Sequence, residues 1–210
     1  MDGIFNKFVL LFTLIDPIGS VPVFIAVSAR AGENLRRRIA VRSVAFAAGI
    51  LLFFIIAGQV LIELMQINLA AFRLAGGVIL FLLAMDMIFG ESKPEHDKAE
   101  ADRAEKQALD LAVYPMAVPS IAGPGSILAV VVLTDNNQYT FLQQAGTALL
   151  VGLVLLLTLV CLLLATRIHR LIGDAGASII SRVMGMITAA IAADMILAAI
   201  DTYYLSSQGP

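Results

Sequence analysis

A short phrase of helix-breaking and polar residues occurs twice in this sequence, each time inside a long apolar stretch. Proline lacks an amide hydrogen and glycine favours non-helical dihedral angles, so each phrase predicts an interrupted helix. The half-helix that restarts after each break presents unpaired N–H groups and the positive end of its dipole, both of which suit a carboxylate. A kink used only for packing is the other interpretation. The predicted binding residues are Asp16, Gly19 and Ser20 in the first phrase, and Gly123, Gly125 and Ser126 in the second, where Gly125-Ser126 follows Gly19-Ser20 by 106 positions.

Asp16 is an ionisable residue near the middle of its apolar stretch. A carboxylate at mid-membrane costs about 2.5–3.5 kcal/mol or more, so such residues are functional hypotheses by default. Asp16 could receive a substrate ammonium or carry a coupling proton. It could equally cap the half-helix that restarts at Pro17, because aspartate before proline is a common helix start. The second phrase has Ala122 at this place, so any function of the charge is asymmetric.

Two further aspartates, Asp86 and Asp194, lie closer to the ends of their apolar stretches. Their positions predict either polar contacts near a membrane interface or a part in a gate or proton path. His96 and His169 have no partner at metal-ligand spacing, and the sequence contains no glycine-rich phosphate loop with lysine. We therefore expect no enzyme activity, no metal, no cofactor and no direct coupling to ATP. Nucleic acid is not expected as a partner either, because no basic stripe is interleaved with aromatic residues.

The composition predicts a membrane protein. Apolar residues make up 60% of the 210 positions and charged residues only 14%, and the mean hydropathy is +0.91. Ordinary globular domains are about 45–50% apolar and about 25% charged. Because a bilayer needs about 20 apolar residues per helix, six windows qualify as membrane-spanning helices. They cover residues 4–28, 39–62, 69–90, 111–134, 140–166 and 179–204.

The lysines and arginines predict the orientation. Six spans place the first, third and fifth connectors on one side, and these carry twelve of the fourteen basic residues. The other side, which also holds both termini, carries only Lys7 and Arg73. We therefore expect both termini to face away from the cytosol, with the polar loop of residues 91–110 on the cytosolic side.

The repeat extends beyond the two breaks. Arg73-Leu74-Ala75-Gly76 recurs as Arg182-Val183-Met184-Gly185, 109 positions later, and Asp86-Met87-Ile88 recurs as Asp194-Met195-Ile196, 108 positions later. The two offsets differ by one residue. Either a local bulge absorbs this difference, or the two aspartates are not equivalent. Three spans per repeat would make the halves inverted, as in many transporters. We predict an all-α polytopic protein with a first repeat at residues 1–90 and an inverted second repeat at residues 111–206; chance similarity between apolar segments is the alternative.

Three phrases resemble the MarC family of integral membrane proteins over almost the whole chain. They are Asp16-Pro17-Ile18-Gly19-Ser20-Val21-Pro22, Arg73-Leu74-Ala75-Gly76-Gly77 and the stretch from Tyr114 to Gly125. The resemblance implies six spans in the cytoplasmic (inner) membrane of a bacterium or archaeon. It does not imply drug efflux. Some family members are described as transporters of small neutral amino acids such as glycine and alanine, exporters among them.

Together these observations lead to the hypothesis of a proton-coupled secondary transporter that exports small neutral amino acids by alternating access. The breaks would hold the substrate carboxylate, and Asp16 would take the ammonium or the coupling proton. A channel-like pore for small solutes would use the same breaks as a filter. A non-transporting scaffold or sensor would act through a partner at residues 91–110. The oligomeric state is not predicted by the sequence.

Overall fold

The computed structural model describes residues 3–28, 31–90, 112–136 and 138–207, and every regular element in these ranges is a helix. The predicted polar loop at 91–110 lies outside the described residues. The elements, in chain order, are α1 (Ile4–Ile15), α2 (Ser20–Val27), α3 (Glu33–Leu64), α4 (Leu69–Phe89), η2 (Ala112–Ile121), α6 (Pro124–Leu133), α7 (Phe141–Leu163) and α8 (Ala165–Ser207).

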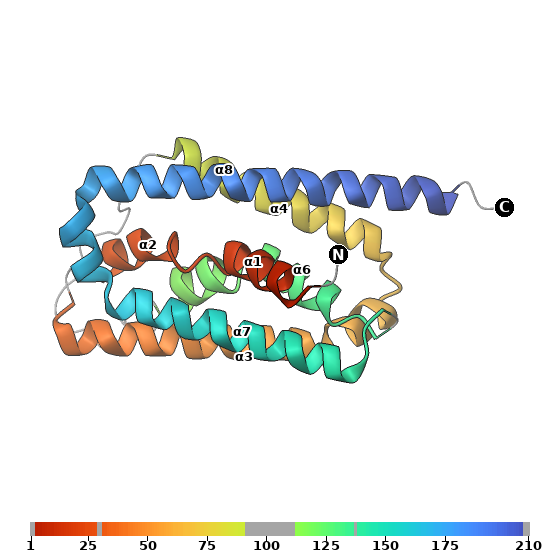
Figure 1. Cartoon of the computed structure of the whole chain (residues 1–210), viewed down its shortest axis with the longest axis horizontal. Coiled ribbons are helices and arrows are strands. Elements are labelled where there is room, and N and C mark those ends of the chain that lie inside the picture. Colours follow the sequence, from red (N-terminus) through yellow and green to blue (C-terminus); the bar gives the residue numbers. More distant parts are fainter. Residues whose placement is uncertain (1–2, 29–30, 91–111, 137, 208–210) are drawn as a thin grey trace.

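The helices form three layers (Figure 1). The long helices α3 and α7 lie side by side in one outer layer, and α4 and α8 lie side by side in the other. The short elements α1, α2, η2 and α6 fill the middle layer. Helices α1, α2 and α6 contact both outer layers, and η2 contacts α3. The interrupted helices are therefore enclosed by protein, which is where non-helical backbone is tolerated at membrane depth.

Both predicted interruptions are present. In the first, α1 ends at Ile15, and Asp16 adopts a left-handed conformation with φ of 48°. In the second, η2 is a wide-turned helix in which Tyr114 and Val118 are extended, with φ of −128° and −130°. Each of these two residues precedes a proline, whose ring disfavours the helical conformation in the residue before it. Ala122 and Gly123 then separate η2 from α6.

Five stretches of the described chain are long and apolar enough to cross a bilayer: Ile4–Ile25, Glu33–Leu64, Ala70–Phe89, Phe141–Leu163 and Ser178–Tyr204. They overlap five of the six predicted windows. The remaining window, 111–134, is divided between η2 and α6, which have ten residues each, so neither helix reaches across by itself. The first of the five stretches includes the break at Asp16.

The helices α4 and α8 pack closely through small residues, and the contact is reciprocal. A Cβ at Gly77 would lie 3.2 Å from the carbonyl oxygen of Ala192, and one at Gly185 would lie 3.1 Å from that of Ala84. Both pairs are related by an offset of 108, the same offset that relates Asp86 to Asp194. With this offset Gly185 pairs with Gly77 rather than with Gly76, and the glycine and the aspartate then share one spacing.

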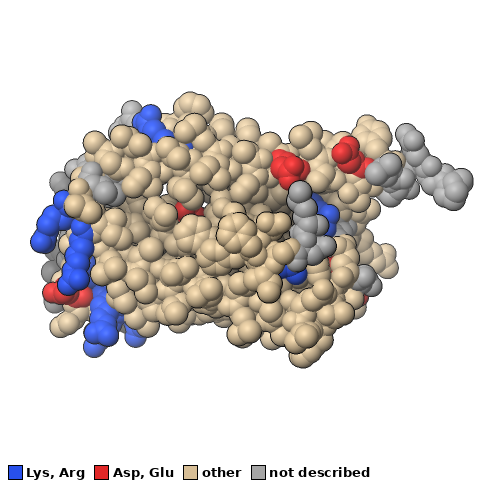
Figure 2. Space-filling model, viewed as in Figure 1, with Lys and Arg blue, Asp and Glu red and all other residues tan. Residues whose placement is uncertain are grey.

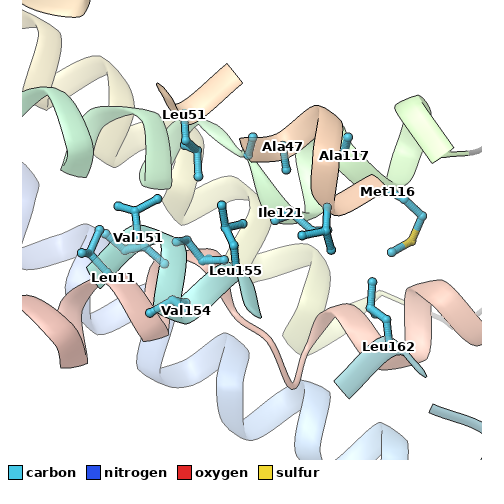
Figure 3. Packing of buried hydrophobic residues seen from close by; sticks show 14 of the residues in the cluster. Leu11, Ala47, Leu51, Met116, Ala117, Ile121, Val151, Val154, Leu155 and Leu162 are labelled. Atoms are coloured by element: carbon cyan, nitrogen blue, oxygen red, sulfur yellow. The ribbon is translucent and has the colours of Figure 1, made fainter. Parts of the chain in front are cut away.

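Side chains from four elements pack together between the middle layer and the α3/α7 layer (Figure 3). Leu11 of α1, Leu51 of α3, Ile121 of η2 and Val154 of α7 are each fully buried there. Because lipid tails are as apolar as these side chains, close packing rather than the hydrophobic effect holds such helices together. This packing fixes α1 and η2, and with them the residues at which the two breaks begin.

Basic side chains gather at one end of the molecule, where α3 begins (Figure 2). The start of α1 and the end of α8 both lie toward the opposite end (Figure 1). Both described ends of the chain therefore lie toward the same end of the molecule. Which side faces the cytosol stays a prediction from the charge asymmetry.

Candidate functional site

The first break is closed by hydrogen bonds from its own backbone. The Asp16 carboxylate accepts from the Gly19 amide through Oδ1 at 2.8 Å, and the Asp16 carbonyl accepts from the Ser20 amide at 3.1 Å. The Val21 amide donates to the Ile18 carbonyl at 3.1 Å. The aspartate side chain therefore caps the start of α2, one of the two roles that the sequence left open. The first amides of this half-helix are already used.

Gly19 permits this cap. A Cβ atom at Gly19 would collide with the Asp16 carboxylate, so the side chain of Asp16 covers the position that any other residue would fill. The Asp16 side chain is half-buried rather than sealed, whereas Gly19 and Ser20 are buried. One carboxylate oxygen accepts from the Gly19 amide, so one lone pair of that oxygen and both lone pairs of the other oxygen remain. The carboxylate thus keeps capacity to accept a hydrogen bond from a ligand.

The second break is built without a charge. Pro124 is the first residue of α6 and needs no amide partner. The hydroxyl of Ser126 lies 3.0 Å from the carbonyl oxygens of both Ile121 and Gly123, and so supplies a hydrogen-bond donor to carbonyls at the end of η2. Within the described part of the chain, the amides of Gly125 and Ser126 donate to no acceptor. The start of α6 therefore retains the free donors that the start of α2 has lost.

The two breaks are linked through their serines. The hydroxyl of Ser120, at the end of η2, lies 3.3 Å from the hydroxyl of Ser20, at the start of α2. In addition, α1 packs against α6 and α2 packs against η2, so each half-helix of one break contacts the other break. The structure thus brings Asp16, Gly19 and Ser20 into the same middle layer as Gly123, Gly125 and Ser126.

The comparison with protein families agrees with these features. A sequence profile described as "MarC family integral membrane protein" matches residues 1–204. The chain belongs to the MarC family.

Relatives of this MarC protein cover nearly its whole length. It is 35% identical over 191 residues to the UPF0056 membrane protein MJ1677 of Methanocaldococcus jannaschii, which spans 89% of this chain and 90% of that relative. It is 32% identical over 199 residues to the UPF0056 inner membrane protein YhgN of Escherichia coli K12, which spans 94% and 95% of the two chains. No solved structure matches it. The family establishes an integral membrane protein, and none of these descriptions names a substrate.

Asp86 and Asp194 of this MarC protein lie apart from the breaks. Both side chains are exposed, on α4 and α8 respectively. Neither makes a hydrogen bond or ion pair with a described residue of the middle layer. Their role in a gate or proton path stays a prediction. Within the described ranges, no group of three or more His, Cys, Asp and Glu side chains is placed to hold a metal ion.

Ser120 is a site residue that the sequence analysis did not single out. A signal was present: with the 106-residue offset, Ser120 corresponds to Leu14, so the second half carries a hydroxyl where the first carries an aliphatic side chain. A polar residue that replaces an apolar one in only one half of a repeat points to a contact outside the repeat's common packing.

Proposed function

We propose that this MarC protein is a secondary transporter of small neutral amino acids that works by alternating access between two inverted three-helix repeats. The observation that carries the proposal is the pair of linked helix breaks in the middle layer, one with a carboxylate and one with free amides. Discontinuous helices at matched positions of two halves are the best sequence and structure pointers to a transporter binding site.

The arrangement of contacts supports the inverted repeat. If α1, α2, α3 and α4 correspond to η2, α6, α7 and α8, the packing of α3 on η2 has its counterpart in α1 on α7, and that of α4 on α6 in α8 on α2. The reciprocal contacts of Gly77 and Gly185 add a pair at residue level. The proposal includes a sixth crossing made by η2 and α6 together. The repeats are residues 1–90 and 111–206.

The difference between the breaks suggests how the substrate lies. A zwitterionic amino acid needs an acceptor for its ammonium and donors for its carboxylate. Asp16 supplies the acceptor at the first break, and the amides of Gly125 and Ser126 supply donors at the second, aided by the positive end of the α6 dipole. This pose assigns the substrate carboxylate to the second break alone. The sequence had assigned it to both.

Coupling and location complete the proposal. Asp16 is the candidate carrier of a coupling proton, since it is the ionisable residue at the breaks. Export is the proposed direction, with the protein in the inner membrane, as the name of the Escherichia coli relative states for that protein. Both termini would then lie on the non-cytosolic side.

The test is transport in proteoliposomes loaded with purified protein. We expect uptake of labelled glycine or alanine that responds to an imposed pH gradient, and exchange of labelled for unlabelled substrate across the membrane. Flux without such exchange would indicate a channel instead. Absence of any amino acid flux would refute the substrate assignment. Asp16→Asn keeps the acceptor for the Gly19 amide and removes the charge, so flux of this variant that still follows the pH gradient would remove Asp16 from coupling.

A further inference from the structure

Thr188 of α8 carries a buried hydroxyl that has no hydrogen-bond partner among the described residues. The residue is only 5% exposed. Five other described threonines behave differently, because each donates to the carbonyl four positions earlier: Thr13, Thr134, Thr147, Thr158 and Thr202. The exposed hydroxyl of Thr166 accepts a hydrogen bond from Arg36. A buried polar group without a partner is costly and calls for an explanation, such as a ligand that supplies the missing bond.

The repeat indicates where this hydroxyl is directed. The offset of 108 that relates Gly77 to Gly185 makes Leu80 the counterpart of Thr188. Leu80 reaches from α4 into the middle layer, where its Cδ1 would lie 2.7 Å from a Cβ built on Gly125. The counterpart of Gly125 is Gly19. The same relation therefore directs Thr188 from α8 toward the first break.

Three differences between the halves place polar groups at that same break. Asp16 replaces the alanine of the second half, Ser120 lies beside Ser20 whereas its counterpart in the first half is Leu14, and Thr188 corresponds to Leu80. If position 188 served only helix packing, a leucine would do there what Leu80 does in the other half. The agreement of the three substitutions points to one polar site beside the first break.

We propose that Thr188 is a ligand contact from α8 that completes the polar site formed by Asp16, Ser20 and Ser120. This inference rests on the proposed function, and it adds the outer layer α4/α8 to the binding site. A hydroxyl can accept a hydrogen bond from an ammonium and donate one to a carboxylate, so it suits a small zwitterion. The Thr188 methyl group narrows the space beside the ligand, which favours a substrate with a small side chain.

The first experiment measures access to position 188 and does not require transport. In a Cys161→Ala background, which removes the single cysteine, Thr188→Cys is treated with a small charged thiol reagent in proteoliposomes. The matched control is Thr158→Cys, since Thr158 is also buried but its hydroxyl is bonded to its own helix at 2.9 Å. We expect faster reaction at 188 than at 158, and slower reaction at 188 when glycine or alanine is added. Equal or slower reaction at 188 overturns the inference, as does reaction unaffected by an amino acid that the wild type transports.

The second experiment measures transport. Thr188→Val removes the hydroxyl and keeps the shape, so KM for the transported amino acid should rise about tenfold, the effect of one lost hydrogen bond. Thr188→Ser should restore most of the affinity, and Thr158→Val should leave KM unchanged. An unchanged KM in Thr188→Val overturns the inference while the proposed function stands. If the wild type transports neither amino acid, the proposed function fails, and faster labelling at 188 still supports a water-accessible site.

Discussion

The two helix breaks differ in the side chains that bond their backbone groups. At the first, a carboxylate caps the restarting helix, and its neighbouring amides are satisfied within the turn. At the second, a proline needs no cap, a serine hydroxyl bonds the preceding carbonyls, and two amides have no acceptor among the described residues. One break therefore offers an acceptor and the other offers donors. Under the proposed function, this difference gives the site one end for an ammonium and another for a carboxylate, which two identical breaks could not provide.

The largest effect should come from removing the acceptor. Asp16→Ala deletes both the charge and the cap on the Gly19 amide, and we expect transport to fall by about 100-fold, as for loss of a buried charged contact. Asp16→Asn should fold as well as the wild type, because its amide oxygen still caps the Gly19 amide. Placing the charge in the other half, as Asp16→Ala combined with Ala122→Asp, should not restore flux. Rescue by that exchange would show that the breaks are interchangeable.

Alanine at Gly19 or at Gly125 should reduce transport less than loss of Asp16 does, and the reduction should differ between the two breaks. Gly19→Ala drives its Cβ into the Asp16 carboxylate and should displace it, whereas Gly125→Ala meets the mobile tip of Leu80. We expect a loss of about tenfold in kcat/KM for the first variant and a smaller loss for the second. Transport assays on equal amounts of purified protein would measure both. A larger loss at Gly125 would contradict the assignment of Asp16 as the more constrained group.

Alanine at Gly77 of α4 or at Gly185 of α8 should destabilise the contact between these helices to a similar extent. Gly77→Ala and Gly185→Ala each place a methyl group close to a backbone carbonyl of the other helix, which cannot swing away. Each should cost about 1–3 kcal/mol, seen as similar drops in the apparent melting temperature in detergent. Gly152→Ala, which meets nothing within 4 Å, is the control and should not lower it. Clearly unequal drops would count against the reciprocal arrangement.

The smallest effects should come from the serines. Ser126→Ala loses a hydroxyl that bonds only its own break, so it should lower stability by about 1 kcal/mol and leave KM unchanged. Ser120→Ala loses the link to Ser20 and should raise KM a few-fold with little change in melting temperature. Paired KM and thermal measurements separate the two outcomes. The reverse pattern would contradict the assignment of a binding role to the Ser120 hydroxyl and a structural role to the Ser126 hydroxyl.

The positions of the helix breaks could be predicted from the sequence, whereas the packing of the helices could be predicted less well. Proline and glycine act locally, so Pro17, Gly19 and Pro124 could be read directly as interruptions. The extended conformations of Tyr114 and Val118 also follow from the prolines after them, although the wide turns of η2 were not foreseen.

Partner helices could not be read in the same way. In water, an apolar stripe marks the buried face of a helix, but in a membrane both faces are apolar and the pattern fades. The contact of Ser120 with Ser20 therefore needed coordinates. So did the choice of Gly77 over Gly76 as the counterpart of Gly185. For the same reason, exposure of Asp86 and Asp194 on the outer helices could not be anticipated from their positions in the repeat.

The contact between Gly77 and Ala192, and its mirror between Gly185 and Ala84, has an evolutionary consequence. Each half of the chain supplies the bare backbone against which the other half is fitted. A bulkier residue gained on one side must therefore be matched by a smaller one on the other. If the halves are the proposed repeats, they could diverge in what they bind, while this shared contact would oblige them to change shape together.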